Sequence, residues 1–146
     1  MNELLSIESS GLKHATCALV SVVASTQAGV EYLLLSPAYP DFTIVNKVLD
    51  ILMRHDDCKD GSVTQRFCLA ILQKMSIKEE VVEKLHQVDF EHWLIKLLEK
   101  STKKGKSIPS ETTSAHENIY GGIHVFCLDF GSALLASIFH SHAVLD

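Results

Sequence analysis

The chain has 146 residues, of which 47% are hydrophobic and 21% are charged, and its formal net charge is −5. This apolar fraction, with so small a net charge, excludes a wholly disordered chain, and the length suits one domain able to bury a core. The excess of acidic residues argues against nucleic acid as the main partner, because duplex binding depends on the neutralisation of phosphates.

The N-terminal segment and the cysteines indicate an intracellular protein. The first residues include Glu3 and Glu8 without a basic flank, which is unlike a secretory signal. The longest uncharged run, residues 15–30, is shorter than the roughly 20 residues that cross a bilayer, so we expect a buried core helix and no membrane span. The four cysteines form no disulfide framework, and we expect a cytoplasmic chain.

Helical periodicity dominates the first third of the chain. Apolar residues at three- and four-residue steps predict a helix over 12–25, capped by Ser9 or Ser10. Its apolar positions are Leu12, Ala15, Leu19, Val22 and Val23. Gly29 then marks a break or a short turn, and a brief apolar helix is predicted over 30–35.

Two prolines, Pro37 and Pro40, force the chain out of helix before the next element. Asp41 is predicted to cap a helix over 42–54. The apolar positions of this helix are Ile44, Val45, Val48, Leu49, Ile51 and Leu52. The Asp-rich stretch 55–61 that follows is predicted to be a polar turn.

Three more helices are predicted before position 101. Ser62 caps the first, over 63–75, and Ser76 caps the second, over 77–86, with Glu79 completing a capping box. Asp89 caps the third, over 90–100. The predicted core positions are Phe67, Cys68, Ile71, Leu72, Met75, Val81, Val82, Leu85, Trp93, Leu94, Leu97 and Leu98.

The composition changes sharply at position 101. Residues 101–121 are predicted to form a basic, Ser- and Thr-rich flexible loop that is open to phosphorylation. A last apolar helix is predicted over 122–140, although its first residues could also start as a strand. We therefore divide the chain into helical repeats over 1–100, the loop over 101–121, and a final repeat helix with its tail over 122–146.

The long helices resemble one another. TCALVSVVAS (Thr16 to Ser25) and FCLAILQKMS (Phe67 to Ser76) align without gaps, with Cys17 over Cys68, and FGSALLASIF (Phe130 to Phe139) fits the same template. A helical period of this length is typical of a stacked α-solenoid, so we predict an all-α chain of about two and a half armadillo- or HEAT-like repeats. The alternative is a plain helical bundle.

Three-helix units of this kind resemble armadillo repeats. Segments 68–100 and 128–139 are similar to the armadillo-repeat region of the LisH-domain, ciliary-base family of armadillo repeat-containing protein nine, or to a divergent relative or fragment. In that family a long helix ends in LQK-(F/L/M)-S-(L/I), and a short helix and a WL-hydrophobic helix follow. LQKMSI occupies 72–77 and the WL pair is Trp93-Leu94. The resemblance implies a scaffold of the basal body, centriole and cilium that acts in ciliogenesis through ciliary-base or microtubule-associated proteins.

No catalytic or metal-binding pattern stands out. A calcium loop over 56–61 fails because Cys58 takes a ligand position and Phe67 stands where an acid is needed. Cys127, His140 and His142, or His55 with Cys58, could be gathered into a zinc site, but they lack the usual ligand spacing. We expect no enzyme activity, no cofactor and no metal.

Partner binding is assigned to polar residues on the long helices and to the basic loop. The candidates are Gln65, Arg66, Gln73, Lys74, Lys103, Lys104 and Lys106. The helices carry no asparagine ladder, which favours a flat domain–domain contact over a peptide groove. The sequence therefore predicts a non-enzymatic, protein-binding scaffold of the cilium; the alternative is a cytoplasmic helical adaptor or regulatory domain unrelated to cilia.

Overall fold

The structure, a computed structural model, describes residues 2–6, 9–53, 62–105, 129 and 131–140. Every regular element in these ranges is helical. In chain order they are α1 (Asn2–Leu5), α2 (Ser10–Val23), α3 (Gln27–Leu35), the 3-10 helix η1 (Pro40–Phe42), α4 (Thr43–Met53), α5 (Val63–Met75), α6 (Glu79–Gln87), α7 (Phe90–Gly105) and the helix Gly131–His140. The predicted all-α class is confirmed.

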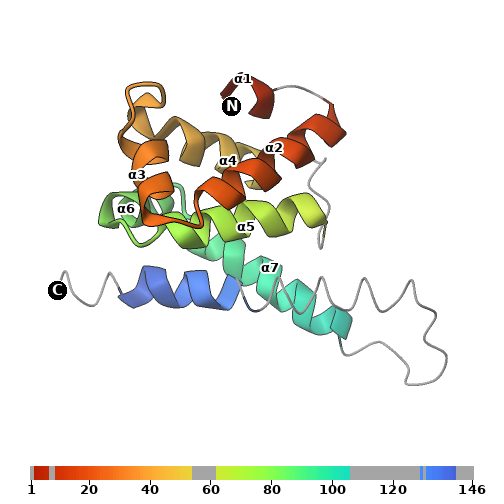
Figure 1. Cartoon of the computed structure of the whole chain (residues 1–146). Helices are drawn as coiled ribbons and strands as arrows, with labels where there is room; N and C mark the ends of the chain where they lie inside the picture. The colour runs from red at the N-terminus through yellow and green to blue at the C-terminus, as the bar shows by residue number, and fades with distance from the viewer. Residues whose placement is uncertain (1, 7–8, 54–61, 106–128, 130, 141–146) are drawn as a thin grey trace.

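Three helices of similar type run in the same direction. Figure 1 shows α2, α5 and the helix Gly131–His140 one above the other, each running from right to left. Contacts join α2 to α5 and α5 to α4, and α1 packs on both α2 and α4. Contacts also join α3 to α4 and α6 to α7.

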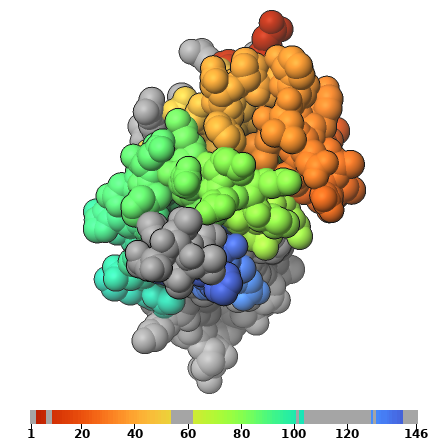
Figure 2. Space-filling view, turned by 90° about the vertical axis from the view of Figure 1, so that its left-hand side faces the viewer, coloured from red at the N-terminus to blue at the C-terminus, as the bar shows by residue number. Residues whose placement is uncertain are grey.

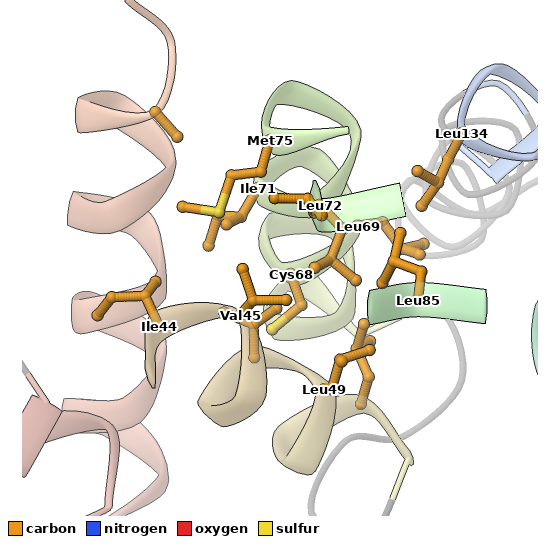
Figure 3. Packing of buried hydrophobic residues seen from close by; sticks show 14 of the residues in the cluster. Ile44, Val45, Leu49, Cys68, Leu69, Ile71, Leu72, Met75, Leu85 and Leu134 are labelled. Carbon is orange, nitrogen blue, oxygen red and sulfur yellow. The ribbon is translucent and has the colours of Figure 1, made fainter. Parts of the chain in front are cut away.

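The same buried spacing recurs in these three helices. The buried positions include Cys17 and Val20 on α2 and Ala24 at its C-cap. The aligned positions on α5 are Cys68, Ile71 and Met75, and those on the last helix are Gly131, Leu134 and Ile138. All nine are buried, and we call them the inner stripe. Figure 3 shows Leu134 pointing toward α5 from the last helix, while Val45 and Leu49 point toward it from α4.

The predicted apolar face of the first long helix is wrong. Leu12, Leu19 and Val22 are 37%, 52% and 68% exposed, whereas Lys13 and Thr16 are buried on the opposite side. Burial of Thr16 costs little because its hydroxyl donates to the Leu12 carbonyl at 2.7 Å. Both faces of α2 have helical periodicity, so periodicity alone does not determine which face is covered.

Corresponding serines lie just past the ends of α2 and α5. Ser25 donates its hydroxyl to the Val22 carbonyl at 2.6 Å, and Ser76 donates to the Gln73 carbonyl at 2.8 Å. Ser76 is therefore the C-cap of α5 and not the predicted cap of the following helix. That helix, α6, begins after Lys78, whose side chain makes no capping hydrogen bond, so the predicted capping box with Glu79 does not form.

The other predicted caps have mixed outcomes. Ser62 caps α5 as predicted, accepting a hydrogen bond from the Gln65 amide at 3.2 Å. Ser9 is the N-cap of α2, but its side chain makes no capping bond. Asp41 is not a cap: it lies inside η1, because Pro40 at the first position starts a 3-10 turn ahead of α4.

Predicted and observed core positions agree closely in the second half of the described chain. Val81, Val82, Leu85, Leu94 and Leu97 are buried. Trp93 and Leu98 are half-buried against this core, and Phe90 is fully buried. The Phe90 and Trp93 rings stack with centroids 5.3 Å apart.

The predicted end of the helix over 90–100 differs from the structure. Helix α7 continues to Gly105, so the first residues of the predicted loop are helical. Glycine is a common residue just past or at the end of a helix, which suits this position. Residues 106–128 lie outside the described residues, and with them the rest of the loop and the predicted start of the last helix.

Among the described residues, not one helix alone is long and apolar enough to cross a bilayer. The bent pair of α2 and α3 together has the required length and composition.

Candidate interaction surface

An outward stripe lies on the same three helices that share the inner stripe. Its positions on α2 are Ala15, Leu19 and Val22; on α5, Arg66, Ala70 and Gln73; and in the C-terminal part, Asp129, Ala133 and Ala136. All nine are partly or fully exposed, and we call them the outer stripe. The outer stripe has the same spacing on each helix, on the side away from the inner stripe.

The chemistry of the outer stripe changes along the molecule. The α2 part is apolar, with Leu19 and Val22 more than half exposed. The α5 part is polar, with Arg66 and Gln73 flanking Ala70. The C-terminal part presents the two alanines behind Asp129. Alanines occur in the stripe on all three helices, and their small side chains allow another folded surface to approach closely.

A hollow lies at the end of α2 and α5, where the chain turns into α3 and α6. Its volume is about 280 Å³. It is lined by Ala24, Ser25, Thr26, Gln27, Val30, Lys74, Ile77 and Lys78. Lys78 pairs with Glu31 at 3.6 Å, and Ile77 is 77% exposed. Figure 2 shows this side of the molecule, with the orange surface around α3 next to the green surface of α5 and α6.

A second hollow, of about 480 Å³, separates α4 from α6. It is lined by Asn46, Leu49, Asp50, Met53, Lys84 and Val88. Its charged residues, Asp50 and Lys84, have opposite signs. The hollow therefore favours no ligand charge, and its lining carries neither a histidine nor a cysteine for general base or nucleophilic work.

The contact between α2 and α5 is unusually polar for a core. His14 Nδ1 lies 3.3 Å from the Thr64 hydroxyl, and the His14 ring meets Phe67 edge-on at 5.5 Å. The Sγ atoms of Cys17 and Cys68 are 3.8 Å apart, and both residues are fully buried. The Cys68 thiol hydrogen bond and the Lys13 charge lower the pKa of the Cys17 thiol, and burial opposes this shift.

The structure separates the predicted partner-binding residues. Gln65 is only 1% exposed, so it belongs to the helix packing and not to a surface; this assignment was wrong because positions 65 and 66 lie on different faces of α5. Arg66, Gln73 and Lys74 are partly exposed on α5.

The basic cluster begins on a helix. Lys103 is exposed at the end of α7, and Lys104 lies in the same helix. Lys106 lies outside the described residues. The three lysines are therefore not brought together with Arg66 and Gln73 by any described contact.

The rejected metal sites fall mostly outside the described residues, which omit positions 54–61, Cys127 and His142. Across the described part of the chain, no three His, Cys, Asp or Glu side chains gather as a metal site would require. Sequence reasoning missed the pairing of Cys17 with Cys68. The signal was present in the alignment, because equivalent positions of two parallel neighbouring helices can meet.

No protein-family model matches the chain, and neither a curated protein nor a solved structure matches it.

Proposed function

We propose that the chain is a non-enzymatic protein-interaction module whose partner binds the outer stripe. The observation that carries the proposal is the recurrence of the outer stripe at equivalent positions of α2, α5 and the C-terminal part, with Leu19 and Val22 exposed on α2 and polar or small residues at the other positions. Exposed apolar side chains beside a polar rim are typical of protein–protein contacts.

The proposed architecture is a short armadillo-type solenoid. Helices α2, α3 and α4 and then α5, α6 and α7 would be two successive units, with Gly131–His140 opening the third. Support comes from the recurring inner stripe and from the equivalent serines Ser25 and Ser76, each of which donates its hydroxyl to a carbonyl three residues earlier. In such a solenoid each unit packs only on its neighbours, and side chains that face away from the stack bind partners.

The binding surface can be tested by site-specific photo-crosslinking. A photoreactive phenylalanine analogue is placed at Leu19, at Gln73 or at Ala136, one position on each helix of the outer stripe. Glu83 is the matched control, because it is exposed on α6, away from the stripe. The proposal expects one and the same protein to be captured from all three stripe positions and not from position 83. Capture from position 83 alone, or of unrelated proteins from the three stripe positions, would contradict it.

We further propose that this module works at the base of the cilium, on the strength of the LQKMSI string and the Trp93-Leu94 pair. The test is the location of the tagged chain in ciliated cells. Enrichment at the ciliary base that is lost in Leu19→Lys/Val22→Lys, with the fold intact, would support both the site and the location. Trp93→Asp serves as the unfolding control, because Trp93 stacks on buried Phe90.

The second candidate is a cytoplasmic helical adaptor or regulatory domain unrelated to cilia. The two hollows and the mixed charges of the α4–α6 side favour it, since they offer a second surface away from the outer stripe. A diffuse signal in ciliated cells, combined with crosslinking from the stripe positions, would favour this candidate.

A further inference from the structure

We propose that Cys17 and Cys68 are a reversible redox pair, which hydrogen peroxide converts into a disulfide that ties α2 to α5. The inference rests on the packing of these two helices and is independent of the partner proposed above. It assigns a modification site to a buried contact that the proposed binding surface does not use.

The geometry requires only a small movement. The two Sγ atoms are 3.8 Å apart and belong to side chains at equivalent positions of parallel, touching helices. A disulfide bond is about 2.0 Å long, so the sulfur atoms must approach by about 1.8 Å. Rotation about the Cα–Cβ bonds of two facing cysteines can supply part of this approach, and a slight closure of α2 onto α5 the rest.

The surroundings select Cys17 as the thiol that reacts first. The hydrogen bond with Cys68 and the positive charge of Lys13, one turn earlier on α2, lower the pKa of the Cys17 thiol against the effect of burial. Lys13 is itself buried, at 6% exposed, and water therefore screens its charge less than that of a surface lysine. The thiolate is the species that attacks a peroxide.

The reaction balances in two steps. The Cys17 thiolate attacks one oxygen of hydrogen peroxide; an S–O bond forms, the O–O bond breaks, and the departing hydroxide takes up a proton as water. The Cys68 thiolate then attacks the sulfenic sulfur of Cys17; the S–S bond forms, the S–O bond breaks, and a second hydroxide leaves as water. Two thiols are oxidised to one disulfide, and one peroxide is reduced to two molecules of water.

Burial of the two thiols limits the rate of their oxidation. Both thiols are fully buried, so peroxide reaches them only when α2 opens from α5. A substitution that loosens this contact without touching the cysteines, such as Val20→Ala, is expected to accelerate oxidation several-fold. Once formed, the disulfide fixes the spacing of the α2 and α5 parts of the outer stripe.

The test uses the full chain carrying Cys58→Ser and Cys127→Ser, treated with hydrogen peroxide near neutral pH. The expected result is an intact-mass loss of two hydrogen atoms, a Cys17–Cys68 linked peptide, and a rise in the thermal midpoint of about 10 °C that a thiol reductant reverses. Cys17→Ser and Cys68→Ser are the matched controls, and each should abolish the mass loss. Peptide mapping of the peroxide-treated chain with all four cysteines gives the same readout without any substitution.

Two outcomes would overturn the proposal. One is a folded protein in which neither thiol changes mass while peroxide oxidises an exposed reference thiol. The other is oxidation of Cys17 to sulfinic acid without a linked peptide, because this would mean that Cys68 does not reach the sulfenic intermediate.

Discussion

At the residue scale, glycine 29 is required by a close approach of two backbone segments. A Cβ atom added at Gly29 would lie 1.8 Å from the Val23 carbonyl oxygen, which belongs to the end of α2. The Gly29 amide also donates to the Thr26 hydroxyl at 3.0 Å, which holds the first turn of α3 against that carbonyl. The predicted break or short turn is therefore misplaced at Gly29: α2 and α3 are separated at 24–26, and the glycine lies inside the first turn of α3 because only glycine fits there.

A pair of Gly→Ala substitutions separates this effect from helix propensity. Gly29→Ala is expected to lower the free energy of unfolding by about 1–3 kcal/mol, as overpacking does. Gly11→Ala, inside α2 with nothing within 4 Å of the added atom, is expected to raise it by up to about 1 kcal/mol. Urea unfolding followed by circular dichroism measures both. Equal effects at the two sites would contradict the close approach.

Asp89 is a second residue with a backbone requirement. Its φ of 54° lies in the left-handed region, and its carbonyl accepts from the Trp93 amide at 3.4 Å as α7 begins. Aspartate tolerates this conformation better than most residues, which is consistent with its predicted place at the start of the helix.

The effect of substitutions at exposed Asp89 on stability should depend on the backbone conformation and not on the lost charge. Asp89→Gly is expected to be neutral or stabilising by up to about 1 kcal/mol, because glycine adopts positive φ without strain. Asp89→Val should destabilise by about 1–2 kcal/mol, because a β-branched residue does not. Thermal unfolding of the unchanged chain and the two variants measures their relative stability. An Asp89→Gly variant that is less stable than Asp89→Val would refute the backbone explanation.

At the element scale, α2 presents apolar residues on two faces and buries only one of them. Its inner stripe contacts α5, while Leu19 and Val22 face outward. The outward residues follow the helical period as well as the buried ones do. That is the physical reason why the sequence predicted helix α2 correctly and its covered face incorrectly.

Neighbouring residues on α2 provide a direct test of the two faces. Val20→Ala is expected to cost about 1–3 kcal/mol, because Val20 is fully buried. Leu19→Ala should change stability by less than about 0.5 kcal/mol although it removes more atoms, because Leu19 is 52% exposed. Chemical denaturation measures the free energy of unfolding of both variants. A larger loss of stability for Leu19→Ala would mean that the face predicted from periodicity is the buried one.

The sequence predicted the bounds of helix α5 better than the roles of single polar residues at its end and on its faces. Helix α5 was predicted to the residue, since Ser62 is a strong cap and its apolar stripe is unambiguous. The role of Ser76 was reversed, because a serine between two helices can cap the second or end the first, and the choice depends on where the backbone turns. The burial of Gln65 was missed because the polarity of a side chain does not by itself show which face of a helix is covered.

At the scale of the whole molecule, the repeated inner stripes raise the question of whether the helices unfold together or one unit at a time. The buried residues form one continuous cluster from Leu5 to Ile138, as in a single bundle. The order of contacts is nevertheless local: α2 touches α5, and the helix Gly131–His140 approaches α7, where a Cβ on Gly131 would lie 2.8 Å from Leu98 Cδ2. A stacked array with such contacts unfolds from its ends, whereas a closed bundle unfolds as one unit.

A substitution at the C-terminal end distinguishes these two kinds of stability. Ile138→Ala removes a fully buried side chain and is expected to destabilise the last helix by about 2–4 kcal/mol. Because α2 belongs to the other end of the stack, native-state hydrogen exchange should show faster exchange in 131–140 and α7 and unchanged exchange in α2. Val20→Ala is the mirror experiment, with faster exchange in α2 and unchanged exchange in the last helix. If either variant accelerates exchange equally in all helices, the chain is one cooperative bundle, and the outer stripe is then the surface of a single rigid body instead of a row of repeats.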